Sequence, residues 1–159
     1  MIKFLLHYFT SNTRHGTHSP FVYALADEVI YNKKYLNSVK QNYDLQRFSG
    51  KYDRLLQAIL TYLQIDQLIF DQYRSMSDKR LALLKDAEQI DANEVSLLTS
   101  NDVLIVSGIY ESTKAQQQWK TLKSNPNVHV TIDLYYFGLV FYRPQQRKED
   151  FKLKYPFWI

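Results

Sequence analysis

The run "DVLIVSGIY", Asp102 to Tyr110, constrains the fold of this chain more than any other stretch. Its centre is apolar at successive positions, which is typical of a strand buried on both faces. Strands of that kind occur in parallel sheets whose faces are covered by helices. The run therefore predicts an α/β protein.

The segments around this run alternate between the two periodicities of helix and strand. A terminal pair of strands is joined by a link too short for a crossover, so this pair must be antiparallel. The pattern predicts a mostly parallel sheet of about four to five strands with an N-terminal helical arm. We expect helices at 52–63, 77–90 (with Ser77 or Asp78 as N-cap) and 111–126, and strands at 67–72, 102–110, 128–134 and 138–143, with 151–159 as an edge strand.

Length and composition set the class of protein. The 159 residues fit one structural unit, which we divide into an arm and connector (1–50) and an α/β domain (51–159). The formal net charge is +4, but Lys and Arg are spread among Asp and Glu, which disfavours a nucleic-acid partner. The chain has no cysteine, which excludes disulfides and thiolate metal sites and favours a cytoplasmic location.

The first residues predict a short docking helix. Lys3 and His7 interrupt its apolar residues and no small-residue cleavage site follows, which argues against a targeting signal. No apolar run reaches the roughly 18 residues of a membrane span. A peripheral membrane anchor is less favoured, because the opposite face carries only one lysine. The apolar residues share one helical face: Ile2, Leu5, Leu6 and Phe9.

The next stretch, "RHGTHSP", carries two histidines and a helix start. Ser19 is a favourable N-cap and Pro20 fits the first helical position. His15 and His18 have no third ligand at a recognisable spacing, so we expect no metal here. We interpret His15, His18, Ser19 and Pro20 as parts of a structural arm.

Two parts of the chain carry a family resemblance. "RHGTHSPFVYALADEVIY" resembles the N-terminal arm of a group of class I S-adenosylmethionine-dependent methyltransferases, in which a His-Gly-x-His-Ser-Pro-Phe-Val run precedes the catalytic domain. Residues 102–155 are similar to that family's fifth strand, following helix, and sixth and seventh strands. The resemblance covers residues 13–31 and 66–155 and implies a reduced Rossmann-like methyltransferase fold.

The chain departs from the family where the family binds its cofactor. There, a glycine-rich turn after strand one approaches the cofactor and an acid after strand two holds the ribose hydroxyls. This chain has four glycines, and none follows a strand in a Gly-x-Gly context. At the end of the fifth strand the family's paired acids are replaced by Ser107 and Gly108, which can neither bind a divalent cation nor act as a base.

Two alignments of the middle segment remain open. In the first, residues 67–78 stand at strand one and the glycine turn. In the second, which we prefer, they are the fourth strand, and Asp71 matches the family's Asp while Gln72 and Tyr73-Arg74 replace its Gly and Asn-His. Strands one to three would then be missing. The resulting exposed edge must be covered by helix 52–63, the arm or a second subunit.

Few residues are candidates for a site. Asp71, Ser107 and Gly108 are weak candidates for cofactor contacts, although Asp71 is favoured as a helix N-cap or as a partner of Arg74. Asp133 is expected to cap a turn. Ser107 lacks the nucleophile-elbow sequence and an identifiable base, so we assign no catalytic residue.

The function expected from the sequence is binding. The chain would be a methyltransferase-like protein that has lost cofactor binding and catalysis, needs no cofactor, and binds itself (a homo-oligomer) or another protein. One alternative is an S-adenosylmethionine-dependent methyltransferase of unknown substrate with atypical cofactor contacts. A second is an RNA-binding module, for which aromatic and basic residues would have to share one face: Tyr135, Tyr136, Tyr142, Arg143, Arg147 and Lys148.

Overall fold

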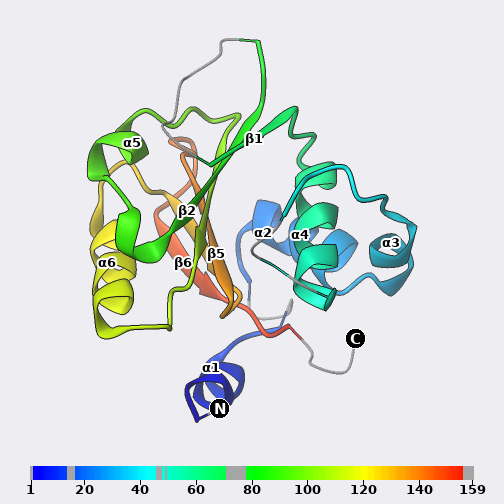
Figure 1. Ribbon diagram of the computed structural model, residues 1–159, viewed down its shortest axis with the longest axis horizontal. Helices are drawn as coiled ribbons and strands as arrows, with labels where there is room; N and C mark the ends of the chain where they lie inside the picture. The colour runs from blue at the N-terminus through cyan, green and yellow to red at the C-terminus, as the bar shows by residue number, and fades with distance from the viewer. Residues whose placement is uncertain (1, 14–16, 46–47, 49, 71–77, 156–159) are drawn as a thin grey trace.

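The computed structural model describes residues 2–13, 17–45, 48, 50–70 and 78–155. A six-stranded sheet lies between two layers of helices (Figure 1). In chain order the strands are β1 (Gln67–Ile69), β2 (Leu81–Asp86), β3 (Val103–Ser107), β4 (Val130–Asp133), β5 (Phe137–Phe141) and β6 (Glu149–Lys152). The helices are α1 (Ile2–Thr10), α2 (Pro20–Leu25), a π-helical segment (Ala26–Ile30), α3 (Lys33–Ser38), α4 (Gly50–Tyr62), a 3-10 turn (Ala87–Gln89), α5 (Ala92–Ser96) and α6 (Thr113–Ser124).

The sheet has the order β1-β2-β3-β5-β4-β6. The pairs β1–β2, β2–β3 and β4–β6 are parallel, whereas β5 is antiparallel to both of its neighbours. Every strand except β5 therefore runs in one direction, and their carboxyl ends meet at one edge of the sheet. The predicted α/β class and the antiparallel pair β4–β5 are confirmed, although the sheet is larger than predicted.

The helix predicted at 77–90 is wrong, because residues 81–86 form strand β2. Leu and Ala have good helix propensity, but tertiary burial overrides it here. Leu81 and Leu83 pack on one face of the sheet and Ala82 and Leu84 on the other. A buried strand and a buried helix segment give the same short apolar run, which is why periodicity alone failed.

The other predicted elements are present with shifted ends. Ser19 caps α2 by accepting a hydrogen bond from the Val22 N–H at 3.3 Å, and Pro20 takes the first helical position. Helices α4 and α6 occupy the predicted segments, and the edge strand β6 begins two residues earlier than predicted. The short helices α3 and α5 lie in segments without a strong apolar period.

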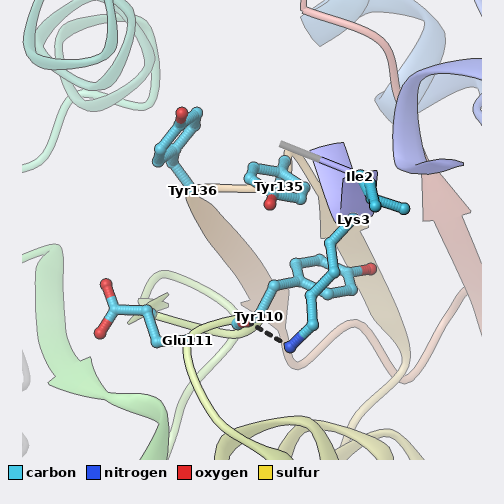
Figure 2. Close-up of a pocket in the computed structure, with 7 residues that line it drawn as sticks. Ile2, Lys3, Tyr110, Glu111, Tyr135 and Tyr136 are labelled. Atoms are coloured by element: carbon cyan, nitrogen blue, oxygen red, sulfur yellow. Dashed lines mark hydrogen bonds between the residues drawn. The ribbon is translucent and has the colours of Figure 1, made fainter. Parts of the chain in front are cut away.

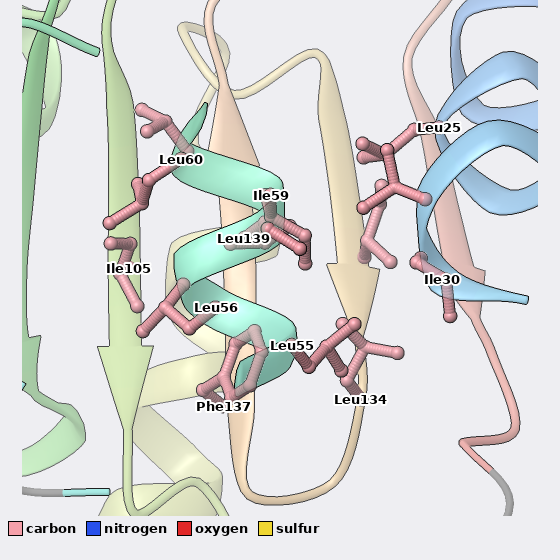
Figure 3. Packing of buried hydrophobic residues seen from close by; sticks show 14 of the residues in the cluster. Leu25, Ile30, Leu55, Leu56, Ile59, Leu60, Ile105, Leu134, Phe137 and Leu139 are labelled. Atoms are coloured by element: carbon pink, nitrogen blue, oxygen red, sulfur yellow. The ribbon is translucent and has the colours of Figure 1, made fainter. Parts of the chain in front are cut away.

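The main core lies between the sheet and the layer formed by α2, the π-helical segment and α4. Figure 3 shows α4 directing its apolar side against β3 and β5. Each leucine or isoleucine side chain buried at this contact contributes about 1.5–3 kcal/mol to the stability of the fold, because it leaves water. The contacting residues are Leu55, Leu56, Ile59 and Leu60 of α4, and Ile105, Phe137 and Leu139 of the sheet.

The second helical layer covers the opposite face of the sheet with α5 and α6. Trp119 of α6 packs directly over Gly138 of β5, where an added Cβ would lie 2.5 Å from the indole. The glycine is thus needed for this close approach of helix and sheet. Within the described part of the chain, no helix is long and apolar enough to cross a membrane.

Helix α1 lies beyond the carboxyl-end edge of the sheet, apart from both helical layers (Figure 1). The prediction that it docks by its apolar face is wrong within this chain, because that face points to solvent. Ile2, Leu5, Leu6 and Phe9 are 74%, 43%, 60% and 75% exposed. The buried residue of the helix is His7.

Candidate functional site

A hollow of about 620 Å³ lies at the carboxyl-end edge of the sheet (Figure 2). In open α/β sheets this is the edge at which ligands bind. Three segments distant in sequence form the wall: α1, the loop after β3 and the β4–β5 turn. They contribute Ile2, Lys3, Gly108, Tyr110, Glu111, Tyr135 and Tyr136.

Asp133, at the end of β4, is the buried polar centre next to this hollow. Its Oδ1 lies 2.9 Å from His7 Nε2 and accepts a hydrogen bond from the Tyr135 N–H, also at 2.9 Å. Its Oδ2 accepts a hydrogen bond from the Tyr110 hydroxyl at 2.5 Å. The predicted turn-capping role of Asp133 is confirmed, and the same carboxyl group also joins α1 to the sheet.

His7 is the buried residue by which α1 contacts Asp133. Its imidazole is 3% exposed, and its Nδ1 lies 3.1 Å from the Ser11 hydroxyl. That hydroxyl donates to the His7 carbonyl at 2.5 Å. His7 was not among the site residues predicted from the sequence, although Lys3, His7 and Ser11 recur every four residues and so mark a polar stripe on the helix.

Aromatic rings enclose this polar centre. Tyr110 and Tyr135 stack with centroids 5.0 Å apart and an interplanar angle of 9°. The Phe4 ring meets Tyr135 edge-on at 5.1 Å, and Tyr136 contacts Tyr52 at 4.2 Å. Such offset and edge-to-face ring pairs stabilise a structure by more than the burial of their surface area alone.

Two local features of the tyrosines indicate a constrained rim. Tyr135 has a φ of 74°, a left-handed conformation that strains a bulky residue and is seen chiefly where the surroundings enforce it. Burial, and secondarily the Asp133 carboxylate, raises the pKa of the Tyr110 hydroxyl above its ordinary value of 10.0. The phenol therefore stays protonated and serves as a hydrogen-bond donor.

The cofactor candidates from the sequence fall partly at this site. Gly108 lines the hollow with a φ of 71°, and a Cβ there would lie 3.1 Å from Glu111 Oε2. Ser107 is buried in β3, and its hydroxyl donates to the Lys85 carbonyl at 3.2 Å. Asp71 lies outside the described residues.

Of the proposed arm, His15 also lies outside the described residues and His18 is exposed. Ser19 and Pro20 begin α2, and the Ser19 hydroxyl accepts a hydrogen bond from the Gln146 side chain. Among the residues that the structure describes, no group of three or more His, Cys, Asp or Glu side chains could hold a metal ion.

The aromatic and basic residues weighed for RNA binding do not share one face. Tyr135 and Tyr136 lie at the carboxyl-end edge, in the turn that precedes β5. Tyr142 and Arg143 follow β5 and so lie at the opposite edge. There the Arg143 guanidinium sits 4.0 Å from the centroid of the Phe21 ring, inside the protein's own packing.

The buried acid beside the hollow's tyrosines is engaged by groups of its own chain. A ribose-binding acid must offer free carboxylate oxygens to two hydroxyl groups. Asp133 already contacts three groups of its own chain, and the sequence holds no glycine between Gly50 and Gly108, the part that includes β1 and β2. The acid that lines the hollow itself is Glu111, beside Gly108.

Comparison with known proteins returned no significant match to a family model, a curated protein or a solved structure.

Proposed function

We propose that this chain is a methyltransferase-like protein that acts by binding and does not use S-adenosylmethionine. The observation that carries the proposal is the engagement of Asp133. Asp133, which is buried beside the hollow, engages both carboxylate oxygens with His7, Tyr110 and Tyr135, and it thereby fixes α1 at the edge where a cofactor would have to lie.

The architecture supports the family part of the proposal. Strand β3, helix α6 and the antiparallel pair β4–β5 follow one another in the order that the resemblance implies. The preferred alignment places a helix after the strand at 67–72, but residues 81–86 form strand β2 instead. The first alignment then remains, with β1 as the family's first strand and residues 71–77, which contain no glycine, at the place of its glycine turn.

The direct test is calorimetric titration of the chain with S-adenosylmethionine and S-adenosylhomocysteine, beside an active class I methyltransferase as positive control. We expect no saturable heat with either compound. Micromolar affinity for either one would overturn the proposal.

One observation favours the rival function, a methyltransferase with atypical contacts: Gly108 opens onto the hollow with a positive φ. If the cofactor does bind there, Gly108→Ala should abolish the binding, because the added Cβ crowds Glu111. Gly50→Ala is the matched control, because Gly50 also has a positive φ, of 58°, yet a Cβ there meets nothing within 4 Å. Cofactor binding that Gly108→Ala abolishes and Gly50→Ala preserves would establish this alternative function.

Self-association is the second part of the proposal. Strand β1 is hydrogen-bonded to β2 on one side and forms the edge of the sheet on the other. Phe70, which follows it, is 43% exposed. An apolar strand edge is a template for pairing with another chain, which supports a homo-oligomer as the expected partner.

A further inference from the structure

Helix α1 exposes its apolar side and buries part of its polar side. A surface helix normally buries its apolar stripe and exposes its polar one. Here His7 is 3% exposed, while Ile2, Leu6 and Phe9 are each at least 60% exposed. The helix thus holds four large apolar side chains away from its own protein.

This orientation is fixed by contacts on the buried side of α1. His7 Nε2 meets Asp133 at 2.9 Å and Phe4 packs edge-on against Tyr135. Rotating the leucines inward would break the His7–Asp133 contact and leave a buried acid without that partner, which is costly. The exposed apolar face is therefore a built feature of the fold.

Basic side chains gather around α1 from another part of the chain. The main chain of Asn12 pairs with the end of β6: its N–H donates to the Lys152 carbonyl at 2.8 Å, and its carbonyl accepts from the Lys154 N–H at 3.0 Å. Lys152 Nζ then donates to the Thr10 hydroxyl at 2.6 Å, and Lys154 Nζ lies 5.1 Å from the Tyr8 ring centroid. With Lys3, whose Nζ donates to the Tyr110 carbonyl at 3.2 Å (Figure 2), three lysines border the helix.

Acidic residues are few in the segments that surround α1, although β6 begins with Glu149 and Asp150. The first acid in the chain is Asp27, and none follows Asp150. Among the residues lining the adjacent hollow, Glu111 is the one acid. The surface border of α1 is therefore formed mainly by lysines.

We propose that α1 docks on an anionic lipid surface, with Ile2, Leu5, Leu6 and Phe9 at the boundary of headgroups and acyl chains. Lys3, Lys152 and Lys154 would lie at the level of the lipid phosphates. Amphipathic helices bind membranes by this combination of apolar area and basic charge. The inference does not depend on the proposed function.

A second copy of this chain fits the surface less well. A two-fold interface would place each helix against its equivalent, and the bordering lysines would then face lysines. Like charges brought together across an interface oppose association. The charge pattern therefore favours an anionic surface over self-pairing through α1.

The test is co-sedimentation with vesicles of phosphatidylcholine alone, and with phosphatidylserine at about one third of the lipid. We expect binding to the anionic vesicles that weakens as salt is added, because salt screens surface charges. The double variant Leu6→Ser/Phe9→Ser should lower the partition coefficient about tenfold or more. The double variant Lys152→Gln/Lys154→Gln should lower it to a similar degree on anionic vesicles.

Leu97→Ser and Lys120→Gln are the matched controls, because Leu97 is 56% exposed and Lys120 is exposed on α6, both away from α1. Unchanged circular dichroism shows that each variant is folded. Absence of sedimentation, equal binding to neutral vesicles, or full binding by the Leu6/Phe9 variant would each overturn the proposal. So would a dimer in solution that the same variant dissociates, which would assign the face to a second copy.

Discussion

Replacing Asp133 by Ala tests whether one carboxyl group holds α1 and the rim tyrosines in place. The side chain is 9% exposed, and its partner His7 is 3% exposed. The substitution removes the acceptor of the Tyr110 hydroxyl and the Tyr135 N–H and leaves His7 Nε2 facing a gap. Three polar groups lose a partner in one change.

The expected cost follows from that loss. Leaving a buried polar group without its hydrogen-bond partner typically costs about 1–3 kcal/mol, and three such groups are affected here. Water can enter from the hollow, so we expect about 3 kcal/mol of unfolding free energy. For a chain of this size that corresponds to a melting temperature about 6–12 °C lower.

The assay combines thermal unfolding with amide hydrogen exchange. Exchange should rise most in α1, because a nine-residue helix is not stable once its contacts are lost. Asp150→Ala is the matched control: Asp150 is an exposed acid on the adjacent strand that accepts from Thr131 at 2.6 Å and lies 3.9 Å from Lys123. It should cost less than about 1 kcal/mol. The reasoning is refuted if Asp133→Ala unfolds within about 1 kcal/mol of the parent, or if α1 keeps its protection from exchange.

Two further predictions concern the assembly and the tyrosines. Light scattering at micromolar concentration should give the mass of a dimer, because β1 is the edge strand of the sheet among the described residues, and a monomer would remove that part of the proposed function. The unfolding free energy should hold steady up to about pH 10 and fall above it. Burial raises the pKa values of Tyr52 and Tyr110 above 10.0, with a smaller contribution from neighbouring tyrosines for Tyr52 and from Asp133 for Tyr110. Above pH 10 the unfolded chain therefore loses protons that the folded chain keeps. Urea unfolding at a series of pH values on both sides of about pH 10 measures this decline. Tyr110→Phe should make the decline in unfolding free energy less steep, and an equal decline in that variant would contradict the role given to Tyr110.

The fold class was predictable because its signals are local. The apolar run of β3, the cap at Ser19 and the period of α4 each specify one element, and the short link between β4 and β5 requires an antiparallel pair. The strand β2 was not predictable in this way. Its sequence suits a helix, and only burial between β1 and β3 makes it a strand.

The site was less predictable than the fold. Gly108 was named as a candidate and lines the hollow, and Asp133 was expected to cap its turn. His7 and Tyr110 were missed, because they reach Asp133 across 126 and 23 residues of chain. A contact of that kind has no spacing in the sequence from which it can be read.

The sequence by itself determined the α/β class, the absence of thiol chemistry and the apolar stripe of α1, because composition and periodicity are properties of neighbouring residues. The tertiary structure alone decided which way that stripe faces. Asp133 draws His7 inward and Lys152 and Lys154 arrive from the other end of the chain, so the leucines face outward within a border of lysines. The orientation of a helix is set by the partners that its two faces find, and those partners lie far away along the chain.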